Sequence, residues 1–246
     1  MKYKAESIKP YNSTDSKTGQ VRQMFDSIAP AYDFMNRAMT LGVDRLWRRK
    51  AVRLVGEYSP QHLLDVATGT GDLALMLHRS LKPAQGIVGI DLSQGMLDVA
   101  VRKVAEAGLA GAITFEVGDC LNLRFADGTF DAVTVAYGVR NFEHLDRGYA
   151  EMHRVLAPGG VLCVVELSTP TGKLVSRLYD FYTQRIIPFV GRLVSKDVRA
   201  YSYLPESIAA VPQGEAMLDI MRAAGFADCR CYRLTFGACS IYIAKK

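Results

Sequence analysis

Short apolar runs alternate with helical patterns along the middle of the chain, and this alternation restricts the fold more than any other feature. The runs predict strands at 62–67, 87–91, 113–117, 130–136 and 161–166. Between them, residues 73–81 and 96–107 repeat apolar side chains at the 3.6-residue period of a helix. Near-continuous apolar strands are typical of a parallel sheet covered by helices on both faces. The alternation therefore predicts a doubly wound α/β fold.

The carboxyl-terminal part of the chain has a different pattern. Residues 217–224 form a helical repeat that stops at Gly225, and glycine is favoured just after a helix. The segments CRCYRLT and ACSIYIA follow, separated by a short Phe-Gly turn. Two adjacent strands with a short turn predict an antiparallel hairpin. We therefore expect a mostly parallel sheet that is completed by a hairpin.

The main domain is expected at 59–246, with one additional segment before it and another inserted within it. Residues 21–58 have helical patterns, whereas residues 168–213 form a long excursion after the fifth strand. Segments of this length are usually functional or carry their own structure. The excursion contains the aromatic residues Tyr179, Phe181, Tyr182, Phe189, Tyr201 and Tyr203. Residues 1–20 are polar, lack the apolar core of a signal peptide and predict a flexible arm.

Composition and charge exclude several classes of protein. Hydrophobic residues make up 49% of the chain and charged residues 22%, as in ordinary globular domains. No run of about 18 uncharged apolar residues occurs, so no transmembrane helix is expected. The net charge of +5 is too small and dispersed to require nucleic-acid binding.

The densest basic cluster comprises Arg45, Arg48, Arg49, Lys50 and Arg53. Apolar residues alternate with it at helical spacing, so it predicts the outer face of an amphipathic helix. Such a face is most often simply solvated, but it also suits a transient contact with anionic lipid headgroups. The sequence leaves both interpretations open, and it leaves a homodimer open as well.

Cysteine and histidine residues give no sign of a metal centre. The cysteines are Cys120, Cys163, Cys229, Cys231 and Cys239. Their odd number, without a secretion signal, predicts reduced thiols in a cytoplasmic protein. The histidines have none of the spacings that hold a metal ion.

A glycine loop follows the first strand in the sequence LLDVATGTGD, residues 63–72. Gly69 and Gly71 can leave room for a ligand against the backbone, and Thr70 can offer a hydroxyl group. The loop lacks both the G-x-G-x-x-G pattern and the Lys-Ser/Thr pair that bind pyrophosphates. It therefore predicts a site for an adenosine without a pyrophosphate, and S-adenosylmethionine is the obvious candidate. Taken alone, the loop is equally consistent with a tight turn.

Two acidic residues strengthen the adenosine interpretation. Asp91 ends the second strand, where a carboxylate can accept hydrogen bonds from both ribose hydroxyls. Asp119 follows the third strand and can accept a hydrogen bond from the adenine amine, while the Cys120 backbone donates to a ring nitrogen. Asp91 could instead cap the helix that follows Ser93, and Asp119 could instead stabilise its own turn. Their register with three successive strands favours the binding site.

The fourth strand ends in VAYGVRNFEH, where an acceptor substrate should meet the cofactor. Arg140 is a permanent cation that could stabilise an oxyanion, and Tyr137 and Asn141 lie beside it. His144 could act as a base, although an ordinary loop position is as consistent with the sequence.

Several segments resemble the ubiquinone/menaquinone biosynthesis C-methyltransferases. GTGD, GID and LAPGG are general to class I methyltransferases, whereas AYDFMN, GVRN and YSYLPESI are more specific to this family. The resemblance extends over nearly the whole chain from about Val21. It implies a Rossmann-like class I S-adenosylmethionine-dependent fold, with a seven-stranded, mostly parallel sheet and a carboxyl-terminal antiparallel hairpin.

The resemblance also implies a reaction, in which S-adenosylmethionine methylates a ring carbon of a demethylated polyprenyl quinol. VATGTGD is similar to menaquinone-type members, so 2-demethylmenaquinol is the preferred substrate. By motif, Thr70, Asp91, Asp119 and Cys120 correspond to cofactor contacts, and Arg140 to an arginine that assists deprotonation. Some members have serine before G-[LV]-R-N where this chain has Ala136 and Tyr137, so a hydroxyl contact there is not carried over.

The polyprenyl tail suggests a role for the flanking segments. Residues 21–58 would cover the active site and residues 168–213 would form a substrate lid or tunnel, although an ordinary hydrophobic subcore has the same composition. Alternative functions are methylation of the ubiquinone-pathway benzoquinol or another lipophilic phenol, and a non-catalytic cofactor-binding scaffold. A cytoplasmic location with peripheral contact at the inner face of the membrane fits such a substrate.

Overall fold

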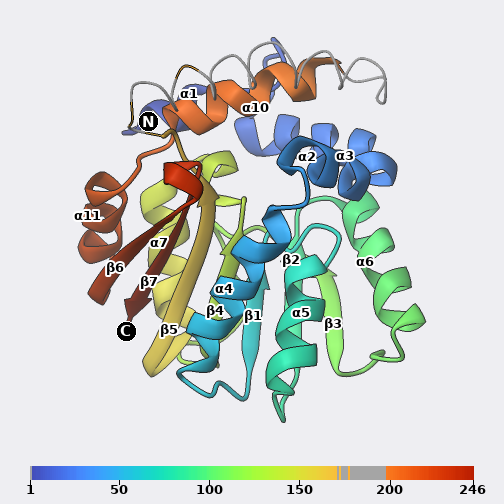
Figure 1. Ribbon diagram of the computed structural model, residues 1–246, viewed down its shortest axis with the longest axis vertical. Coiled ribbons are helices and arrows are strands. Elements are labelled where there is room, and N and C mark those ends of the chain that lie inside the picture. The colour runs from blue at the N-terminus through green and yellow to red at the C-terminus, as the bar shows by residue number, and fades with distance from the viewer. Residues whose placement is uncertain (1, 171, 173–176, 178–197) are drawn as a thin grey trace.

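The computed structural model describes residues 2–170, 172, 177 and 198–246 (Figure 1). Its helices are α1 (Lys4–Ser7), α2 (Lys17–Ile28), η1 (Ala29–Ala31), α3 (Tyr32–Thr40), α4 (Asp44–Gly56), α5 (Asp72–Leu81), α6 (Gln94–Glu106), η2 (Val139–Asn141), α7 (Leu145–Val155), α10 (Val198–Ala210), α11 (Glu215–Ala223) and η4 (Thr235–Gly237). Its strands are β1 (Leu63–Val66), β2 (Ile87–Asp91), β3 (Ile113–Val117), β4 (Phe130–Ala136), β5 (Leu156–Leu167), β6 (Ala227–Leu234) and β7 (Cys239–Lys245).

The strands form one 7-stranded sheet in the order β3-β2-β1-β4-β5-β7-β6. Neighbouring strands from β3 to β5 are parallel, whereas β7 is antiparallel to both β5 and β6. The predicted doubly wound sheet with a carboxyl-terminal hairpin is therefore confirmed. The order reverses between β1 and β4, which is the point where open α/β sheets bind their ligands.

Helices cover both faces of the sheet, as the apolar strands predicted. α4, α5 and α6 lie on one face and α7 and α11 on the other (Figure 1). Alternate residues of β5 serve the two layers, since Leu162 and Val164 pack with α7 and α11 while Cys163 and Val165 pack with α4 and α5. The sheet is thus buried on both sides, and its carboxyl edge is left to form a site.

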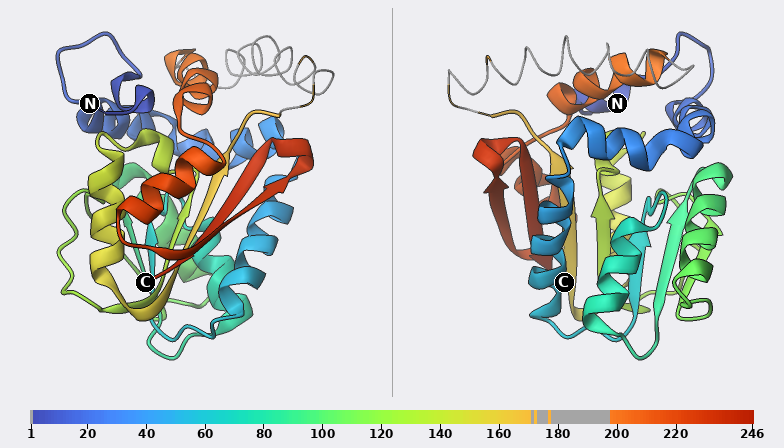
Figure 2. Two further views of the ribbon diagram at one scale, coloured as in Figure 1. Left: turned by 90° about the vertical axis from the view of Figure 1, so that its left-hand side faces the viewer. Right: turned by 45° about the vertical axis from the view of Figure 1, so that its right-hand side comes forward.

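A cap of helices crosses this carboxyl edge. α1, α2, α3 and α10 lie above the strand ends in all three views (Figures 1 and 2). The helices expected at 21–58 are therefore present, with α2 starting earlier, at Lys17, where Ser16 accepts a hydrogen bond from the Gly19 backbone at 3.1 Å. Gly19 lies in the first turn of α2, so Ser16 supplies the N-cap that the helix needs.

The structure differs from the flexible arm expected at 1–20. Ala5 is fully buried, and the Glu6 carboxylate accepts a hydrogen bond from the Leu145 backbone at 3.0 Å. The ammonium group of Lys17 is also buried and donates to the carbonyl oxygens of Ala5 and Arg140, at 2.7 and 3.0 Å. A polar segment can be buried when its polar groups are hydrogen-bonded in this way. Composition alone does not reveal such pairing.

Candidate active site

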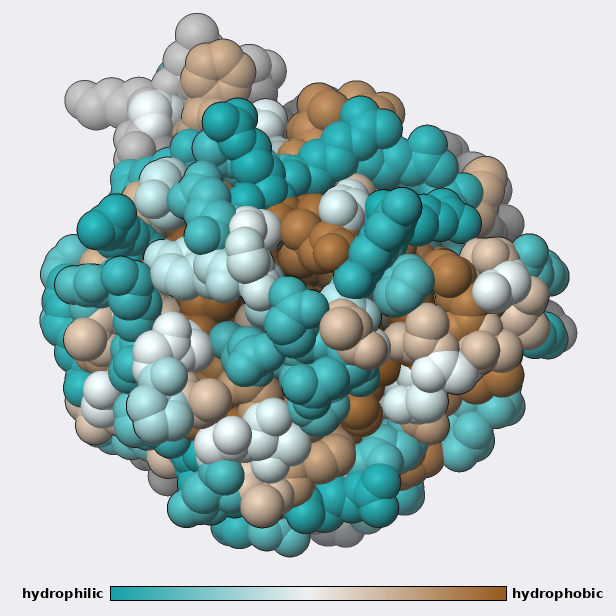
Figure 3. Space-filling model, turned by 90° about the horizontal axis from the view of Figure 1, so that it is seen from below, coloured by the Kyte–Doolittle hydropathy of each residue, from teal (hydrophilic) through white to brown (hydrophobic). Residues whose placement is uncertain are grey.

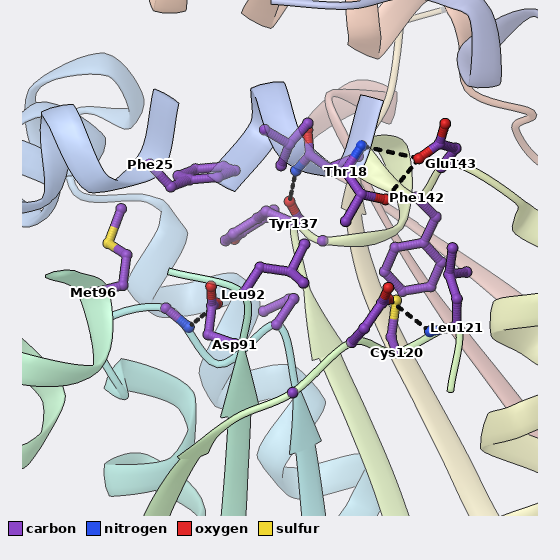
Figure 4. A pocket seen from close by; sticks show the side chains of 18 of the residues that line it. Thr18, Phe25, Asp91, Leu92, Met96, Cys120, Leu121, Tyr137, Phe142 and Glu143 are labelled. Carbon is purple, nitrogen blue, oxygen red and sulfur yellow. Dashed lines mark hydrogen bonds between the residues drawn. The ribbon is translucent and has the colours of Figure 1, made fainter. Parts of the chain in front are cut away.

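The ends of β1, β2, β3 and β4 meet under α2 and the first residue of α3 and enclose a cavity (Figure 4). We call it the loop cavity. Its lining includes Thr18, Val21, Phe25, Tyr32, Gly69, Asp91, Met96, Asp119, Cys120, Tyr137, Asn141 and Glu143. Figure 4 shows Asp91 and Cys120 on facing sides, with Phe25 and Thr18 of α2 above them. Glu143 closes the upper side, because its carboxylate accepts hydrogen bonds from the Thr18 backbone and hydroxyl at 3.0 and 2.8 Å.

The two glycines of the loop have different roles. Gly69 lines the cavity with φ 57°, and an added Cβ atom would meet only Tyr32, at 4.0 Å. Gly71 has φ 76°, and a Cβ atom there would lie 3.0 Å from the Phe115 ring and 3.1 Å from Ala100. Gly71 is therefore required by the turn and by close packing against α6 and β3. Gly69 leaves the backbone open to a ligand.

Asp91 is fixed in the loop cavity by backbone groups. Its two carboxylate oxygens accept hydrogen bonds from the Ser93 and Gly69 N–H groups, at 2.9 and 2.8 Å. Burial raises the pKa of Asp91 to about 6, although these N–H groups favour the ionised form. A carboxylate oxygen has more than one lone pair, so both oxygens can still accept a ligand hydroxyl.

Asp119 and Cys120 lie across the cavity from Asp91. One oxygen of Asp119 accepts a hydrogen bond from the Leu121 backbone at 2.9 Å, which fixes the turn after β3. Burial raises the pKa of the Cys120 thiol well above its ordinary value, so this thiol is a neutral wall of the cavity. The structure thus brings Gly69, Asp91 and the Asp119–Cys120 turn together, as the sequence reasoning expected.

Thr70 is placed differently from the expectation. Its hydroxyl donates to the Asp33 carboxylate at 2.6 Å and does not line the loop cavity. Asp33 also binds Lys103 at 2.8 Å, and Lys103 in turn pairs with Asp72. Lys103 lowers the pKa of Asp72 against the opposing effect of burial. This network attaches α3 to the glycine loop. The Thr70 hydroxyl is therefore bonded to Asp33 of α3 and holds the two elements together.

A second, apolar cavity of about 290 Å³ adjoins the first. We call it the apolar cavity. Its walls come from α3, α4, α10 and the η4 turn, and include Asn36, Met39, Leu41, Val43, Asp44, Trp47, Leu167, Leu204, Ile208 and Thr235. Tyr32 and Tyr137 line both cavities and mark where they meet. A large apolar space beside a cavity that contains the Asp91 and Asp119 carboxylates suits a substrate with a hydrocarbon part.

Part of the excursion at 168–213 contributes to this cavity. Leu204 and Ile208 of α10 line its wall, and Tyr203 donates to the Asn141 side chain at 3.0 Å. Tyr179, Phe181, Tyr182 and Phe189 lie outside the described residues, as does the side chain of Tyr201. The lid function expected for this excursion therefore stays a prediction.

Tyr137 and Arg140 stand at the junction of the two cavities. Tyr137 has φ 60°, a backbone conformation that bulky residues rarely adopt, and its ring lies under the guanidinium of Arg48 at 5.1 Å. Arg140 is buried and pairs with Glu166 at 2.8 Å. Burial opposes the charge on Arg140, but Glu166 raises its pKa overall. Arg140 therefore remains a permanent cation beside the apolar cavity.

Three buried donor groups near this junction have no hydrogen-bond partner among the described residues. They are the Tyr137 hydroxyl, the Arg140 Nε–H and the Arg48 Nε–H. Leaving a buried donor unpaired costs about 1–3 kcal/mol, so such groups usually await a ligand or water. Tyr137 and Arg140 both line the apolar cavity. An oxygen atom of a bound molecule could accept hydrogen bonds there.

The structure does not bring His144 to either cavity. It is exposed just before α7 and lines neither space. Sequence reasoning missed Asp44, which is the carboxylate that lines the apolar cavity among the described residues. Asp44 is buried, accepts a hydrogen bond from the Thr40 hydroxyl at 2.9 Å and pairs with Arg48. The available signal was an acid at helical spacing from Trp47, on the inner face of α4.

Glu166 was also missed as a functional position, because it appeared only as the end of a predicted strand. It is buried, and its carboxylate accepts hydrogen bonds from Arg140 at 2.8 Å and from the Leu167 backbone at 2.9 Å. A charged residue at the end of an otherwise apolar strand is the signal that could have identified it.

Comparison with known proteins decides the family. The model of the ubiE/COQ5 methyltransferase family matches residues 13–246. The chain belongs to this family. It is 49% identical to a demethylmenaquinone methyltransferase of Bacteroides fragilis, over 100% of both chains. It is 44% identical to a demethylmenaquinone methyltransferase of Porphyromonas gingivalis over 98% of each chain, and 44% identical to a ubiquinone/menaquinone biosynthesis C-methyltransferase of Geobacter sulfurreducens over 99% of this chain and 94% of the other. The methyltransferase family inferred from the motifs is confirmed.

Solved structures agree on the fold. An S-adenosylmethionine-dependent methyltransferase of Aquifex aeolicus superposes with a TM-score of 0.58 at 17% identity, over 79% of this chain and 88% of the other. The [4+2]-cyclase SpnF superposes with a TM-score of 0.60 at 20% identity, over 93% and 96%. At these identities the likeness concerns the fold, and the reaction has to be argued from the site.

Within the described part of the chain, no helix combines the length and apolar character needed to cross a membrane.

Proposed function

We propose that this methyltransferase transfers the methyl group of S-adenosylmethionine to a ring carbon of 2-demethylmenaquinol, giving menaquinol in the last step of menaquinone biosynthesis. The full-length similarity to demethylmenaquinone methyltransferases supports this substrate. The observation that carries the proposal is the meeting of the loop cavity, with its Asp91 and Asp119 carboxylates, and the apolar cavity at Tyr137, where buried donors lack partners. Such a junction suits a phenolic ring with a hydrocarbon tail.

The donor set of the loop cavity fits S-adenosylmethionine. Asp91 would bind the ribose hydroxyls, while Asp119 and the Cys120 backbone would bind adenine. Gly69 leaves room for the ligand, since the nearest atom to a Cβ atom there would be in the Tyr32 ring, at 4.0 Å. When bound, S-adenosylmethionine supplies an electrophilic methyl group on sulfonium sulfur. The roles of Thr70 and Gly71 are then to hold the loop, through Asp33 and through packing against Phe115.

The quinol would bind with its ring near Tyr137 and its tail in the apolar cavity. A phenol has a pKa near 10, so the anion that activates the ortho carbon needs stabilisation at neutral pH. Arg140 supplies a fixed positive charge and an unpaired Nε–H at this place. It is not a base, because arginine stays protonated. Electrostatic stabilisation of a developing oxyanion in a buried site is typically worth several kcal/mol.

Asp44 is the carboxylate placed to accept the quinol proton, directly or through water. It lines the apolar cavity and is oriented by Thr40 and Arg48. This position replaces the base that the sequence suggested at His144. With S-adenosylmethionine bound, the ring carbon would take its methyl group, S-adenosylhomocysteine would leave, and loss of the proton from that ring carbon would restore the aromatic quinol. Alignment of the two bound molecules can supply a large part of the rate.

A direct test is incubation of the protein with isotopically labelled S-adenosylmethionine and a short-chain demethylmenaquinol, followed by mass analysis of the product. Gain of one labelled methyl group on the ring is expected. A demethylated ubiquinone-pathway benzoquinol serves as the comparison acceptor, since the relative from Geobacter sulfurreducens carries both pathway names. Binding of S-adenosylmethionine without turnover of any quinol would contradict the proposal and favour a scaffold.

An Arg140→Met variant tests the proposed mechanism within the same assay. We expect it to bind S-adenosylmethionine normally, because Arg140 does not line the loop cavity, but to lose most of its turnover. Full turnover in this variant would remove Arg140 from the mechanism. A polyprenyl substrate also implies that the protein meets the inner face of the cytoplasmic membrane, at least transiently.

A further inference from the structure

Two apolar side chains stand out on the surface of the described chain. Leu41 is 81% exposed and Phe236 is 82% exposed, more than any other large hydrophobic residue described. Leu41 lies in the turn between α3 and α4, and Phe236 in the η4 turn between β6 and β7. They come from distant parts of the sequence, but α4, which follows the first turn, is joined to η4 by a hydrogen bond of 2.8 Å from Trp47 to Thr235.

Both residues flank the apolar cavity. Leu41 and Thr235, the neighbour of Phe236, belong to its lining. The right-hand view of Figure 2 shows the α3–α4 turn and η4 close together at the end of the molecule where the parallel strands terminate. The left-hand view places them on the same side. The mouth of the cavity is thus bordered by two exposed apolar residues.

The backbone at both positions is unusual. Leu41 has φ 51° and Phe236 has φ 56°, in the left-handed region that favours glycine and asparagine. A bulky residue in this region costs about 1–2 kcal/mol. Neither side chain recovers this cost by packing in the protein, since both are exposed. Their apolar character is therefore explained by a contact outside the protein.

Basic residues surround the α3–α4 turn. Arg37 precedes Leu41 by one helical turn, and Arg45 and Arg49 follow on α4; all three are exposed. Within the described residues these arginines form no ion pair. They line a polar hollow of about 560 Å³ on the other side of α4 from the apolar cavity. Apolar tips framed by unpaired arginines match the interface of an anionic bilayer in both hydropathy and charge.

The far end of the molecule looks different. Seen from below, at the end opposite the cap helices, hydrophilic residues are spread over most of the surface and hydrophobic ones show mainly between them (Figure 3). A bilayer contact would therefore use the cavity end, which is also where a lipid substrate would have to enter.

We infer that Leu41 and Phe236 insert into an anionic membrane surface and, with Arg37, Arg45 and Arg49, dock the mouth of the apolar cavity onto it. This surface, which we call the docking face, lets a polyprenyl tail pass from the bilayer into the cavity without crossing water. The inference rests on the proposed quinol substrate, but its binding step can be measured without turnover. Not all of the basic cluster noted in the sequence belongs to the docking face, because Arg48 is buried and forms an ion pair with Asp44.

Vesicle sedimentation tests the docking face. The wild-type protein is mixed with vesicles of phosphatidylcholine alone, and with vesicles that contain phosphatidylglycerol. We expect binding to the anionic vesicles that weakens with salt, because charge attraction is screened. Leu41→Asn and Phe236→Asn should each weaken this binding about tenfold, as loss of a buried large apolar side chain predicts. Asparagine tolerates the left-handed backbone, so both variants should fold.

Matched controls separate insertion from general surface hydropathy. Val101 is 52% exposed on α6, away from both cavities, and Val101→Gln should bind vesicles like the wild type. Arg45→Gln combined with Arg49→Gln should remove the preference for anionic vesicles. The docking face is overturned if the wild type does not bind anionic vesicles, or if the Leu41 and Phe236 variants bind as well as Val101→Gln.

Turnover distinguishes this inference from the proposed function. Phe236→Asn should methylate a short-chain, water-soluble demethylmenaquinol at the wild-type rate and lose rate only with a long-chain quinol in vesicles. If Phe236→Asn matched the wild-type rate on both substrates, the docking face would be contradicted and the proposed reaction would stand. No methylation of either quinol by the wild type, with vesicle binding unchanged, would instead contradict the proposed function.

Discussion

The buried pair of Arg140 and Glu166 allows a sharp test of how the site is held. Glu166 accepts three hydrogen bonds, from the Arg140 guanidinium at 2.8 Å, the Arg140 backbone at 3.2 Å and the Leu167 backbone at 2.9 Å. The change Glu166→Gln keeps the shape but turns one of the two oxygens into an N–H donor. In either orientation of the amide, this donor faces another donor. The guanidinium also loses its counter-ion.

The expected cost follows from burial. The two side chains are 7% and 2% exposed, so water cannot replace the lost partner. Breaking a buried ion pair from one side typically costs about 3–5 kcal/mol. Because glutamine keeps one acceptor, we expect about 3 kcal/mol of lost unfolding free energy. For a domain of this size, that corresponds to a fall of about 6–12 °C in melting temperature.

Equilibrium unfolding in urea measures this loss of unfolding free energy. A second, more exposed ion pair provides a matched control. Glu151 binds Arg154 with both oxygens at 2.9 Å and also accepts the Leu123 backbone at 2.8 Å, but its side chain is 19% exposed and that of Arg154 is 30% exposed. Glu151→Gln should cost no more than about 1 kcal/mol, because water can solvate the remaining groups.

A double-mutant cycle isolates the pair itself. Arg140→Met combined with Glu166→Gln removes both charges, so the double variant should be more stable than the sum of the single losses by about 2 kcal/mol. If the cycle gives an interaction below about 0.5 kcal/mol, or if Glu151→Gln costs as much as Glu166→Gln, burial does not control the energy of this pair and the reasoning is refuted.

Further predictions concern the loop cavity, the glycine loop and the acceptor site. Burial raises the pKa of Asp91 to about 6, so affinity for S-adenosylmethionine, measured by calorimetry, should fall below pH 6 as the carboxyl protonates. Because the pKa of Asp91 is raised from the ordinary 3.8, the folded ligand-free protein binds this proton more tightly than the unfolded chain, so its stability should fall as pH rises from about 3.8 to about 6. Asp91→Asn should abolish both pH trends and weaken S-adenosylmethionine binding about tenfold or more. Gly71→Ala should destabilise by about 2–3 kcal/mol in urea, because its Cβ atom would crowd Phe115 at a positive φ, whereas Gly108→Ala, with positive φ and open space, should cost only about 1 kcal/mol. Asp44→Asn should lower kcat about 100-fold with KM little changed, and kcat should then rise with pH as solvent hydroxide replaces the base; an unchanged pH profile would exclude Asp44 as proton acceptor.

The fold was predictable because local patterns agreed with the global arrangement. Apolar runs without alternation indicated strands buried on both faces, and residues such as Cys163 and Val165 are indeed covered by helices on one side while their neighbours are covered on the other. The strand boundaries were less predictable. β5 starts at Leu156 and not at 161, because its first residues include the exposed Pro158 and Gly159, which carry no apolar signal.

The site was predictable where function depends on position along a strand. Asp91 ends one parallel strand and Asp119 follows the next along the chain, so their convergence at one edge of the sheet followed from the predicted topology. Thr70 was not predictable in the same way. Its hydroxyl is taken by Asp33, a residue of α3 that is far away in sequence. The sequence pattern around the glycine loop does not indicate which helix packs above it.

By itself, the sequence determined a doubly wound sheet with a carboxyl-terminal hairpin, and the edge at which a nucleoside should bind. Those features depend on the period of apolar residues and on strand order, which the chain carries locally. Only the tertiary structure decided that His144 lies outside, that Asp44 and Arg140 face one cavity, and that Leu41 and Thr235, the neighbour of the exposed Phe236, line the same cavity. The physical reason is that these relations depend on how α3, α4 and η4 pack across distances that no sequence period encodes.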